Sequence, residues 1–245
     1  MELIVLPSPA EVAELAAARI AATVHLKPTA VLGLATGSSP LATYGRLAMR
    51  VQAGELDLSR VTAFALDEYV GIPKDHPESY YSVIQREVVR PLAMDPERVH
   101  LLDGGASDFE DECSRYEVAI ASAGGIDIQL LGIGTNGHIG FNEPGTSFNS
   151  KTAVKELALQ TRADNARFFD SLDAVPSRCL TQGIATILNA EELLLVAQGR
   201  HKAAAIGAAI EGPLTSKCPA SSIRLHRNAT VVIDEAAAAD LSRRH

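Results

Sequence analysis

The sequence predicts an α/β fold: a mainly parallel, Rossmann-like sheet with helices on both faces, in one three-layer α/β/α domain that spans residues 1–245. Short apolar runs typical of strands alternate with longer runs that have the spacing of amphipathic helices, which is the pattern of parallel α/β proteins. With 245 residues, of which 47% are hydrophobic, the chain can bury one sizeable core. It shows no repeat of fixed period and no low-complexity linker, so we expect a single domain.

Predicted strands and helices alternate along the chain. Glu2–Leu6 has the composition of an edge strand, and Pro9–Leu26 is an Ala-rich amphipathic helix that Ser8 can cap. The next predicted elements are a strand at 31–35, a helix to about residue 51, a strand at 61–66, a helix at about 78–91 and a strand at 99–102. A helix at 109–123, a buried strand at 126–132, and late strands at Glu192–Ala197 and 230–233, each followed by a helix, complete the pattern.

Residues 145–180 are less regular than the rest and carry many polar side chains. A polar segment that connects two strands of a parallel sheet can cross the ends of those strands. We therefore predict that this segment covers the carboxyl ends of the strands as a candidate active-site lid.

Charge and cysteine content exclude several classes of partner. The formal net charge is −8 and the pI about 5.4, which argues against nucleic acid or an anionic membrane as a partner. No stretch is long and apolar enough to span a bilayer, and the N-terminus lacks the features of a signal peptide. The three cysteines are widely spaced without metal-ligand spacing, which suits a reducing compartment, so a cytoplasmic location is expected.

The loop that follows the buried strand at 126–131 holds the densest set of polar groups. It contains Asn136, His138 and Glu143 among several glycines, which allow the backbone to approach a ligand closely. Ligands bind at this edge of open α/β sheets, and histidine exchanges protons near neutral pH. Glu143 could fold back to hold the imidazole in one tautomer. The alternative is a tight turn at Asn136-Gly137 with His138 at the surface.

Two further segments carry candidate ligand-binding groups. Thr36, Gly37, Ser38 and Ser39 join a predicted strand to a helix, where backbone N–H groups bind phosphate, although the same residues also suit an ordinary helix cap. This is neither a dinucleotide fingerprint nor a Walker sequence. Arg167 and Lys202 could together hold a phosphomonoester, or each could be a surface charge.

Asp67 and Glu68 end the strand predicted at 61–66. Adjacent side chains of a strand point to opposite sides. We therefore expect one carboxylate in the crevice and the other against a neighbouring helix. A helix cap or a solvated pair is the alternative.

Four segments of the chain carry a family resemblance. They are LATGSSP (34–40), LDEYVG (66–71), HPESYY (76–81) and GTNGHIGFNEP (134–144). Together they resemble the glucosamine-6-phosphate deaminase family, and the resemblance extends from about Leu3 to Asp234. The wider superfamily includes sugar-phosphate lactonases, but the second and third segments point to the deaminase.

The resemblance implies a reaction and a role for each site residue. Glucosamine 6-phosphate and water would become fructose 6-phosphate and ammonia, without a metal or an organic cofactor. His138 would open the sugar ring with the support of Glu143 and Asn136, and Asp67 would move a proton between C2 and C1. The positions that match the family's phosphate site are Thr36, Gly37, Ser38, Ser39, Arg167 and Lys202.

Two departures from the family pattern bear on regulation. Asn136 stands where some members have an aspartate, and an amide orients an imidazole without stabilising its charged form, so a different pH optimum is expected. At the stretch that binds the activator in allosteric hexamers, Lys155 is present, but Ala153 and Glu156 replace a basic residue and a hydroxyl. The longer C-terminal tail of those forms is also absent. These features predict a monomer or small homo-oligomer and argue against the allosteric hexamer.

Two other functions are consistent with parts of the sequence. A lactonase or a simple sugar-phosphate isomerase would share the phosphate loop, but only the deaminase releases ammonia. A sugar-phosphate sensor usually carries a DNA-binding module, for which the chain has neither spare length nor a basic region.

Overall fold

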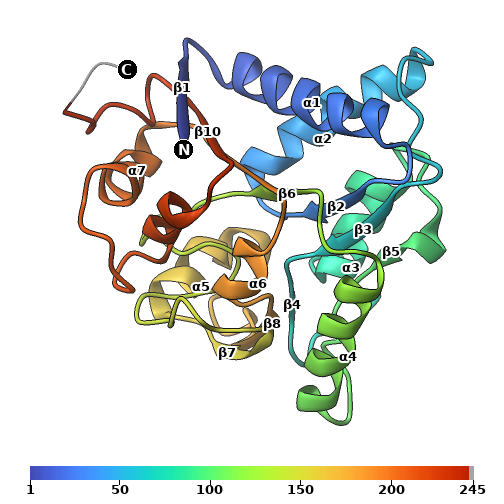
Figure 1. Ribbon diagram of the computed structural model, residues 1–245. Helices are drawn as coiled ribbons and strands as arrows, with labels where there is room; N and C mark the ends of the chain where they lie inside the picture. The colour runs from blue at the N-terminus through green and yellow to red at the C-terminus, as the bar shows by residue number, and fades with distance from the viewer. Residues whose placement is uncertain (243–245) are drawn as a thin grey trace.

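In the computed structural model, which describes residues 1–242, a parallel seven-stranded sheet forms the centre of the molecule (Figure 1). In spatial order its strands are β1 (Glu2–Leu6), β10 (Ala229–Asp234), β9 (Glu192–Ala197), β6 (Ile128–Leu131), β2 (Val31–Leu34), β3 (Thr62–Ala65) and β5 (Val99–His100). The predicted mainly parallel sheet is confirmed, and β1 is the edge strand that its composition indicated.

Helices cover both faces of this sheet, as predicted. Helix α1 (Pro9–Leu26) begins at Ser8, whose hydroxyl accepts the backbone N–H of Glu11, and it packs beside α2 (Ser38–Gln52) on the upper face in Figure 1. The opposite face carries α4 (Phe109–Ser122) and α6 (Ile184–Leu188), which are joined by a 2.6 Å hydrogen bond from the Thr186 hydroxyl to Glu117. The remaining helical elements are α3 (Tyr80–Ile84), α5 (Leu159–Asn165), α7 (Ala203–Ile210), the π-helix η1 (Gln85–Val89), and the 3₁₀ turns η2 (Pro96–Arg98), η3 (Ala166–Phe168), η4 (Arg200–Lys202) and η5 (Pro219–Leu225).

The structure corrects the prediction at the end of the chain. Residues 235–240 form turns, although their Ala-rich sequence predicted a helix after β10. The Asp234 carboxylate accepts the backbone N–H of Ala237 at 2.8 Å and that of Gly199 at 2.9 Å. These bonds satisfy backbone groups in a turn, so tertiary contacts override the helix propensity of the alanines.

A second, antiparallel sheet was not predicted. It consists of β4 (Asp67–Tyr69), β8 (Arg178–Thr181) and β7 (Ala153–Glu156), with β8 in the middle. The segment predicted as an irregular lid, 145–180, therefore contains β7, α5, η3 and most of β8, and is more regular than expected. Its position over the strand ends agrees with the prediction (Figure 1).

The strand order determines where the ligand-binding crevice of an open α/β sheet is expected. From β2 the chain proceeds through β3 to the β5 edge, and then returns to add β6 on the other side of β2. The loops that follow β2 and β6 consequently leave the sheet side by side. In open α/β sheets this reversal point is where ligands bind.

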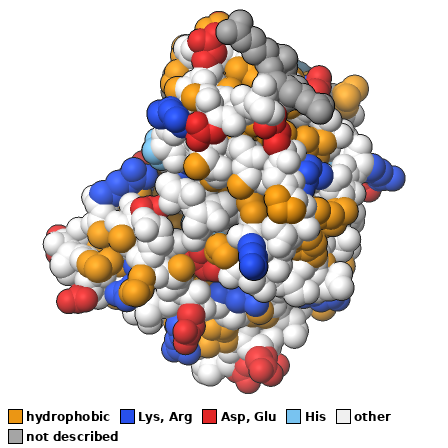
Figure 2. Space-filling view, turned by 90° about the vertical axis from the view of Figure 1, so that its left-hand side faces the viewer, with side chains coloured by type: hydrophobic (Ala, Val, Ile, Leu, Met, Phe, Trp, Pro, Cys, Tyr) orange, Lys and Arg blue, Asp and Glu red, His pale blue; other side chains and the backbone are white. Residues whose placement is uncertain are grey.

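The outer surface carries both signs of charge. On the face shown in Figure 2, acidic and basic side chains are interspersed with hydrophobic ones. Within residues 1–242, no helix has both the length and the hydropathy required to cross a bilayer.

Candidate active site

A cavity of about 440 Å³ opens at the carboxyl ends of β2, β3, β6 and β9. The structure brings the predicted phosphate-binding residues to its wall together with two of the predicted catalytic residues, namely Thr36, Gly37, Ser38, Ser39, Arg167, Lys202, Asp67 and His138. Asn136 and Glu143 do not line the cavity and lie behind His138. Residues from separate parts of the chain thus form one site at the predicted edge of the sheet.

One end of the cavity is suited to an anion. Gly37 ends the turn between β2 and α2 with φ +97°, a conformation that favours glycine, and no side chain caps the helix that starts at Ser38. The first N–H groups of α2 are therefore available to a ligand. Tyr44 holds this turn, because its hydroxyl accepts the N–H of Ala35 at 3.0 Å and donates to the carbonyl of Ala35 at 2.9 Å.

Two cations border the same end of the cavity. Arg167 is exposed, and its guanidinium stacks 4.7 Å from the ring centroid of Phe168. Lys202 follows β9, and its Nζ donates to the carbonyl of Ile133 at 2.7 Å. Burial lowers the pKa of Lys202; the nearby Asp164 carboxylate opposes this shift, and Arg167 adds to it. Both cations and Asp164 therefore lie within electrostatic reach of one another.

Asp67 and Glu68 occupy the opposite sides of β4, as their alternation predicted. Asp67 is 5% exposed and borders the cavity. Glu68 points away from it and accepts the backbone N–H groups of Tyr69, Tyr80 and Tyr81 at 2.8, 2.9 and 2.8 Å. Burial, followed by the charge of Glu68, raises the pKa of the Asp67 carboxyl well above its usual range. Such a carboxylate is a stronger base than an exposed one.

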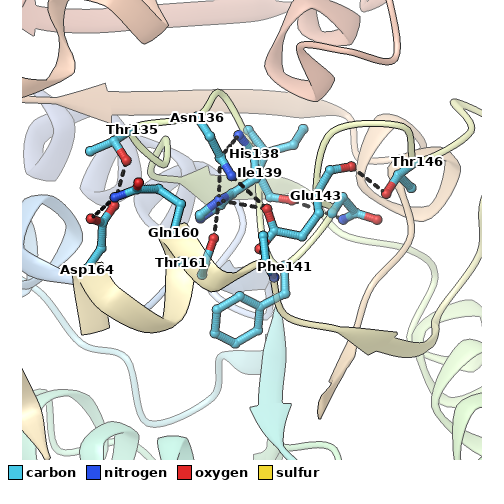
Figure 3. A network of polar contacts seen from close by, with 12 residues as sticks. Thr135, Asn136, His138, Ile139, Phe141, Glu143, Thr146, Gln160, Thr161 and Asp164 are labelled. Atoms are coloured by element: carbon cyan, nitrogen blue, oxygen red, sulfur yellow. Dashed lines mark hydrogen bonds and ion pairs between the residues drawn. The ribbon is translucent and has the colours of Figure 1, made fainter. Parts of the chain in front are cut away.

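His138 is held by a hydrogen-bonded chain that ends at Glu143 (Figure 3). Its Nδ1 lies 2.8 Å from Asn136 Oδ1, and Asn136 Nδ2 donates to Glu143 Oε2 at 2.8 Å. Glu143 therefore acts mainly through Asn136, since its own oxygen is 3.6 Å from Nδ1. With Nδ1–H donating to the amide oxygen, Nε2 of the neutral ring is left free to accept a proton.

Glu143 is the charged end of this chain. Burial alone would raise the pKa of its carboxyl, but the neighbouring His138, the Thr161 hydroxyl and the Asn136 amide together lower it to about 2. The carboxylate is therefore ionised near neutral pH and places a negative charge 3.6 Å from His138 Nδ1.

Gly134 leaves the space that the His138 ring occupies. A Cβ at Gly134 would lie 2.2 to 2.5 Å from three atoms of that ring. We expect Gly134→Ala to displace the imidazole from Asn136 and to lower kcat by about tenfold or more, within the range of general acid–base groups. Steady-state kinetics should show this loss while the circular dichroism spectrum stays unchanged. Gly45→Ala is a suitable control, because a Cβ there meets no heavy atom within 4 Å.

Several cavity residues were not assigned from the sequence. Tyr80 contacts Tyr69 with ring centroids 4.8 Å apart, Thr161 lies 3.4 Å from His138 Nδ1, and Thr135 donates to Asp164. Tyr80 and Thr135 belong to the segments that carried the family resemblance, so those segments already contained a signal. Thr161 and Asp164 belong to the lid segment, whose path over the cavity had to be known first.

The chain matches one protein family over most of its length. Residues 8–232 match glucosamine-6-phosphate isomerases/6-phosphogluconolactonase. Glucosamine-6-phosphate deaminases of Rhodococcus opacus (strain B4) and Bifidobacterium longum subsp. infantis are 56% and 51% identical, over 98% of this chain and 93% and 92% of theirs. A solved structure of a monomeric glucosamine-6-phosphate deaminase superposes with a TM-score of 0.96 at 44% identity, covering 98% of this chain and 100% of that one. The 6-phosphogluconolactonase from Trypanosoma cruzi, at 22% identity and a TM-score of 0.76 over 99% of this chain and 97% of its own, shares the fold.

Proposed function

The chain belongs to the family of glucosamine-6-phosphate isomerases and 6-phosphogluconolactonases, and we propose that it converts glucosamine 6-phosphate and water to fructose 6-phosphate and ammonia. The observation that carries this proposal is the pairing, in one cavity, of a buried carboxylate with raised pKa at Asp67 and a histidine oriented through Asn136 by Glu143. The reaction needs two such proton-transfer groups, beside a site for a phosphate. Relatives more than half identical to this chain are named for this activity.

Ring opening is the first chemical step. The closed sugar must lose the proton of its anomeric hydroxyl and gain one at the ring oxygen. His138 performs this exchange, because its free Nε2 accepts a proton while Nδ1 stays bonded to Asn136. Glu143 stabilises the imidazolium that forms between the two transfers. The phosphate, held by Arg167, Lys202 and the start of α2, positions the sugar for these transfers.

Isomerisation and loss of ammonia follow. Asp67 takes the proton from C2 of the open aldehyde, whose amine enters as an ammonium. The electron pair of that C–H bond forms the C1=C2 double bond, and O1 takes a proton from the ammonium, which gives the enolamine. The same carboxyl returns its proton to C1, which becomes CH₂OH, and the lone pair of the nitrogen makes C2 an iminium. Water adds to C2, one of its protons passes to the nitrogen, and the C–N bond breaks. The remaining hydroxyl proton passes to the departing ammonia as the ketone forms. Each proton taken is returned, so Asp67 and His138 end the cycle in their starting states.

The direct test is to incubate the purified protein with glucosamine 6-phosphate and to measure ammonia and fructose 6-phosphate. Equal amounts of both products are expected. A lactonase would instead hydrolyse 6-phosphogluconolactone and release no ammonia, so that substrate is assayed in parallel. A phosphate-binding sensor would bind the sugar phosphate and produce nothing.

Catalysis by Asp67 also predicts an acid limb in the pH profile. The carboxylate must be ionised to accept the C2 proton, and burial with the charge of Glu68 raises its pKa. At saturating substrate, kcat should therefore fall as the pH drops through this raised pKa, well above 3.8, the ordinary value for the carboxyl. An acid limb at the ordinary carboxyl value would contradict the assignment of Asp67 as the base.

We further propose that the enzyme acts as a monomer or small homo-oligomer in the cytoplasm, with hyperbolic kinetics. Glu156 on β7 is exposed and would repel a phosphorylated activator, and Ala153 offers it no polar contact. Lys155 alone gives too little differential affinity to shift an equilibrium between two quaternary states. Saturation curves with and without N-acetylglucosamine 6-phosphate should coincide, and light scattering should give a low mass. A sigmoidal curve that the activator makes hyperbolic, with a hexameric mass, would overturn this proposal.

A further inference from the structure

Helix α5 meets the loop after β6 along a single stripe. The backbone N–H of Ala158 donates to Glu143 Oε1 at 3.2 Å, the Thr161 hydroxyl lies 3.4 Å from His138 Nδ1, and Asp164 Oδ2 accepts from the Thr135 hydroxyl at 2.5 Å. These three residues are spaced by three, so they lie on one face of the helix. The lid segment is therefore attached to the catalytic loop by polar contacts at each successive turn.

The third contact differs from the other two. The Ala158 and Thr161 contacts involve Glu143 and His138, whereas Thr135 and Asp164 bond to each other outside that chain (Figure 3). Gln160 Nε2 donates to the other carboxylate oxygen of Asp164 at 2.8 Å and fixes its orientation. A hydrogen bond to a charged acceptor is stronger than one between neutral groups. The bond at Thr135 is thus a charge-assisted contact between α5 and the loop after β6 that does not involve the proton-transfer groups.

Asp164 is a carboxylate that borders a cavity with two cations, so its role there requires an explanation. It borders the same cavity as Arg167 and Lys202, and it acts on the titration of Lys202. A carboxylate beside a phosphate site repels the phosphate, so it weakens binding unless it also contributes favourably. Asp164 precedes Arg167 by one helical turn, so whatever fixes Asp164 also fixes the backbone that carries Arg167.

We propose that Asp164 is a positioning residue that latches the lid. Through Thr135 it holds α5 against the loop after β6 and places Arg167 over the phosphate end of the cavity before the substrate arrives. The proposal rests on the proposed function, because it assigns the phosphate contact to Arg167. The loop after β6 would then have two roles. Asn136 in this loop orients His138, and Thr135, through Asp164, fixes the position of Arg167.

The test uses two matched pairs in the full-length protein. Thr135→Val removes the hydroxyl at nearly constant volume, and Thr135→Ser retains it. Asp164→Ala removes the acceptor, and Asp164→Asn retains an oxygen that Thr135 can reach while removing the charge. Asp173→Ala is the control, since Asp173 is an exposed carboxylate of the same lid segment.

Amide hydrogen exchange of residues 159–168 reports the latch directly. We expect exchange about tenfold faster in Thr135→Val and Asp164→Ala, the effect of losing one hydrogen bond to a charged group. Thr135→Ser and Asp173→Ala should match the wild type. Asp164→Asn, whose hydrogen bond to Thr135 is uncharged, should exchange at a rate between those of the wild type and Asp164→Ala. The double variant Thr135→Val/Asp164→Ala should exchange no faster than either single variant, because both remove the same bond.

Kinetics and ligand binding supply the second readout. KM for glucosamine 6-phosphate should rise in Thr135→Val and Asp164→Ala with a smaller change in kcat, and the dissociation constant of inorganic phosphate should rise in parallel. Unchanged exchange in Thr135→Val, or additive effects in the double variant, would overturn the latch. A lower KM in Asp164→Ala with unchanged exchange would show that Asp164 only repels phosphate. Exchange and phosphate binding need no turnover, so a protein that forms no ammonia would refute the proposed function and leave this test intact.

Discussion

Replacing Asp67 by asparagine is expected to lower kcat by about 10²–10⁴, the usual contribution of a general acid–base group. The amide has almost the same shape as the carboxylate but cannot take a proton from C2. The variant should fold at least as well as the wild type. Burial raises the pKa of Asp67, which means that the folded protein disfavours its ionised form, and that cost disappears when a neutral amide replaces it.

Turnover and thermal stability should therefore change in opposite directions. Both are measured on Asp67→Asn and on Asp75→Asn, a control at an exposed carboxylate. The control should resemble the wild type in kcat and melting temperature. A kcat for Asp67→Asn within about threefold of the wild type would remove Asp67 from the proton-transfer step.

The second large effect is expected at the phosphate end of the cavity. Lys202→Met should raise KM for glucosamine 6-phosphate by one to two decades, because a hydrogen bond to a charged group contributes about 1.5–3 kcal/mol. The methionine keeps most of the apolar stem and loses the ammonium that lies 2.7 Å from the Ile133 carbonyl. Lys217→Met, at an exposed lysine, is the matched control and should leave KM unchanged.

Activity on glucosamine, which lacks the phosphate, distinguishes a loss of phosphate binding from a general disturbance of the site. Glucosamine should be a very poor substrate for the wild type, and Lys202→Met should lower its kcat/KM little further. An equal loss on both substrates would mean that Lys202 supports the cavity in another way. An unchanged KM for the phosphorylated sugar would place the phosphate elsewhere.

Local patterns predicted the parts of the fold that depend on local sequence. Helix α1 and its Ser8 cap, the strand after it, and the opposite orientation of Asp67 and Glu68 all follow from periodicity within short windows. The antiparallel sheet was missed because β4 is only three residues long and pairs with β8, more than a hundred positions away. Pairing over that distance leaves no trace in a local window.

The site was also predictable only where it depends on local sequence. Residue types in the loop after β6 indicated proton transfer at His138, but not that Asn136 stands between the ring and Glu143. The turns after β10 show the same limit, since the bond from Gly199 to Asp234 joins the loop after β9 to the end of β10, which only the folded sheet brings together. Roles that depend on which loop meets which other loop required the structure.

The place of β10 has a consequence for how the protein matures during synthesis. It lies between β1 and β9, so β1 has no neighbour in the sheet until β10 has been synthesised. The same strand ends in Asp234, whose carboxylate holds the loop that leads to Lys202. A nascent chain therefore completes neither the sheet nor the hydrogen bonds of the loop before Lys202 until β10 has been translated. Until then both edges of β1 are unpaired, whereas in the folded sheet only its outer edge is, and unpaired strand edges of incomplete chains favour aggregation.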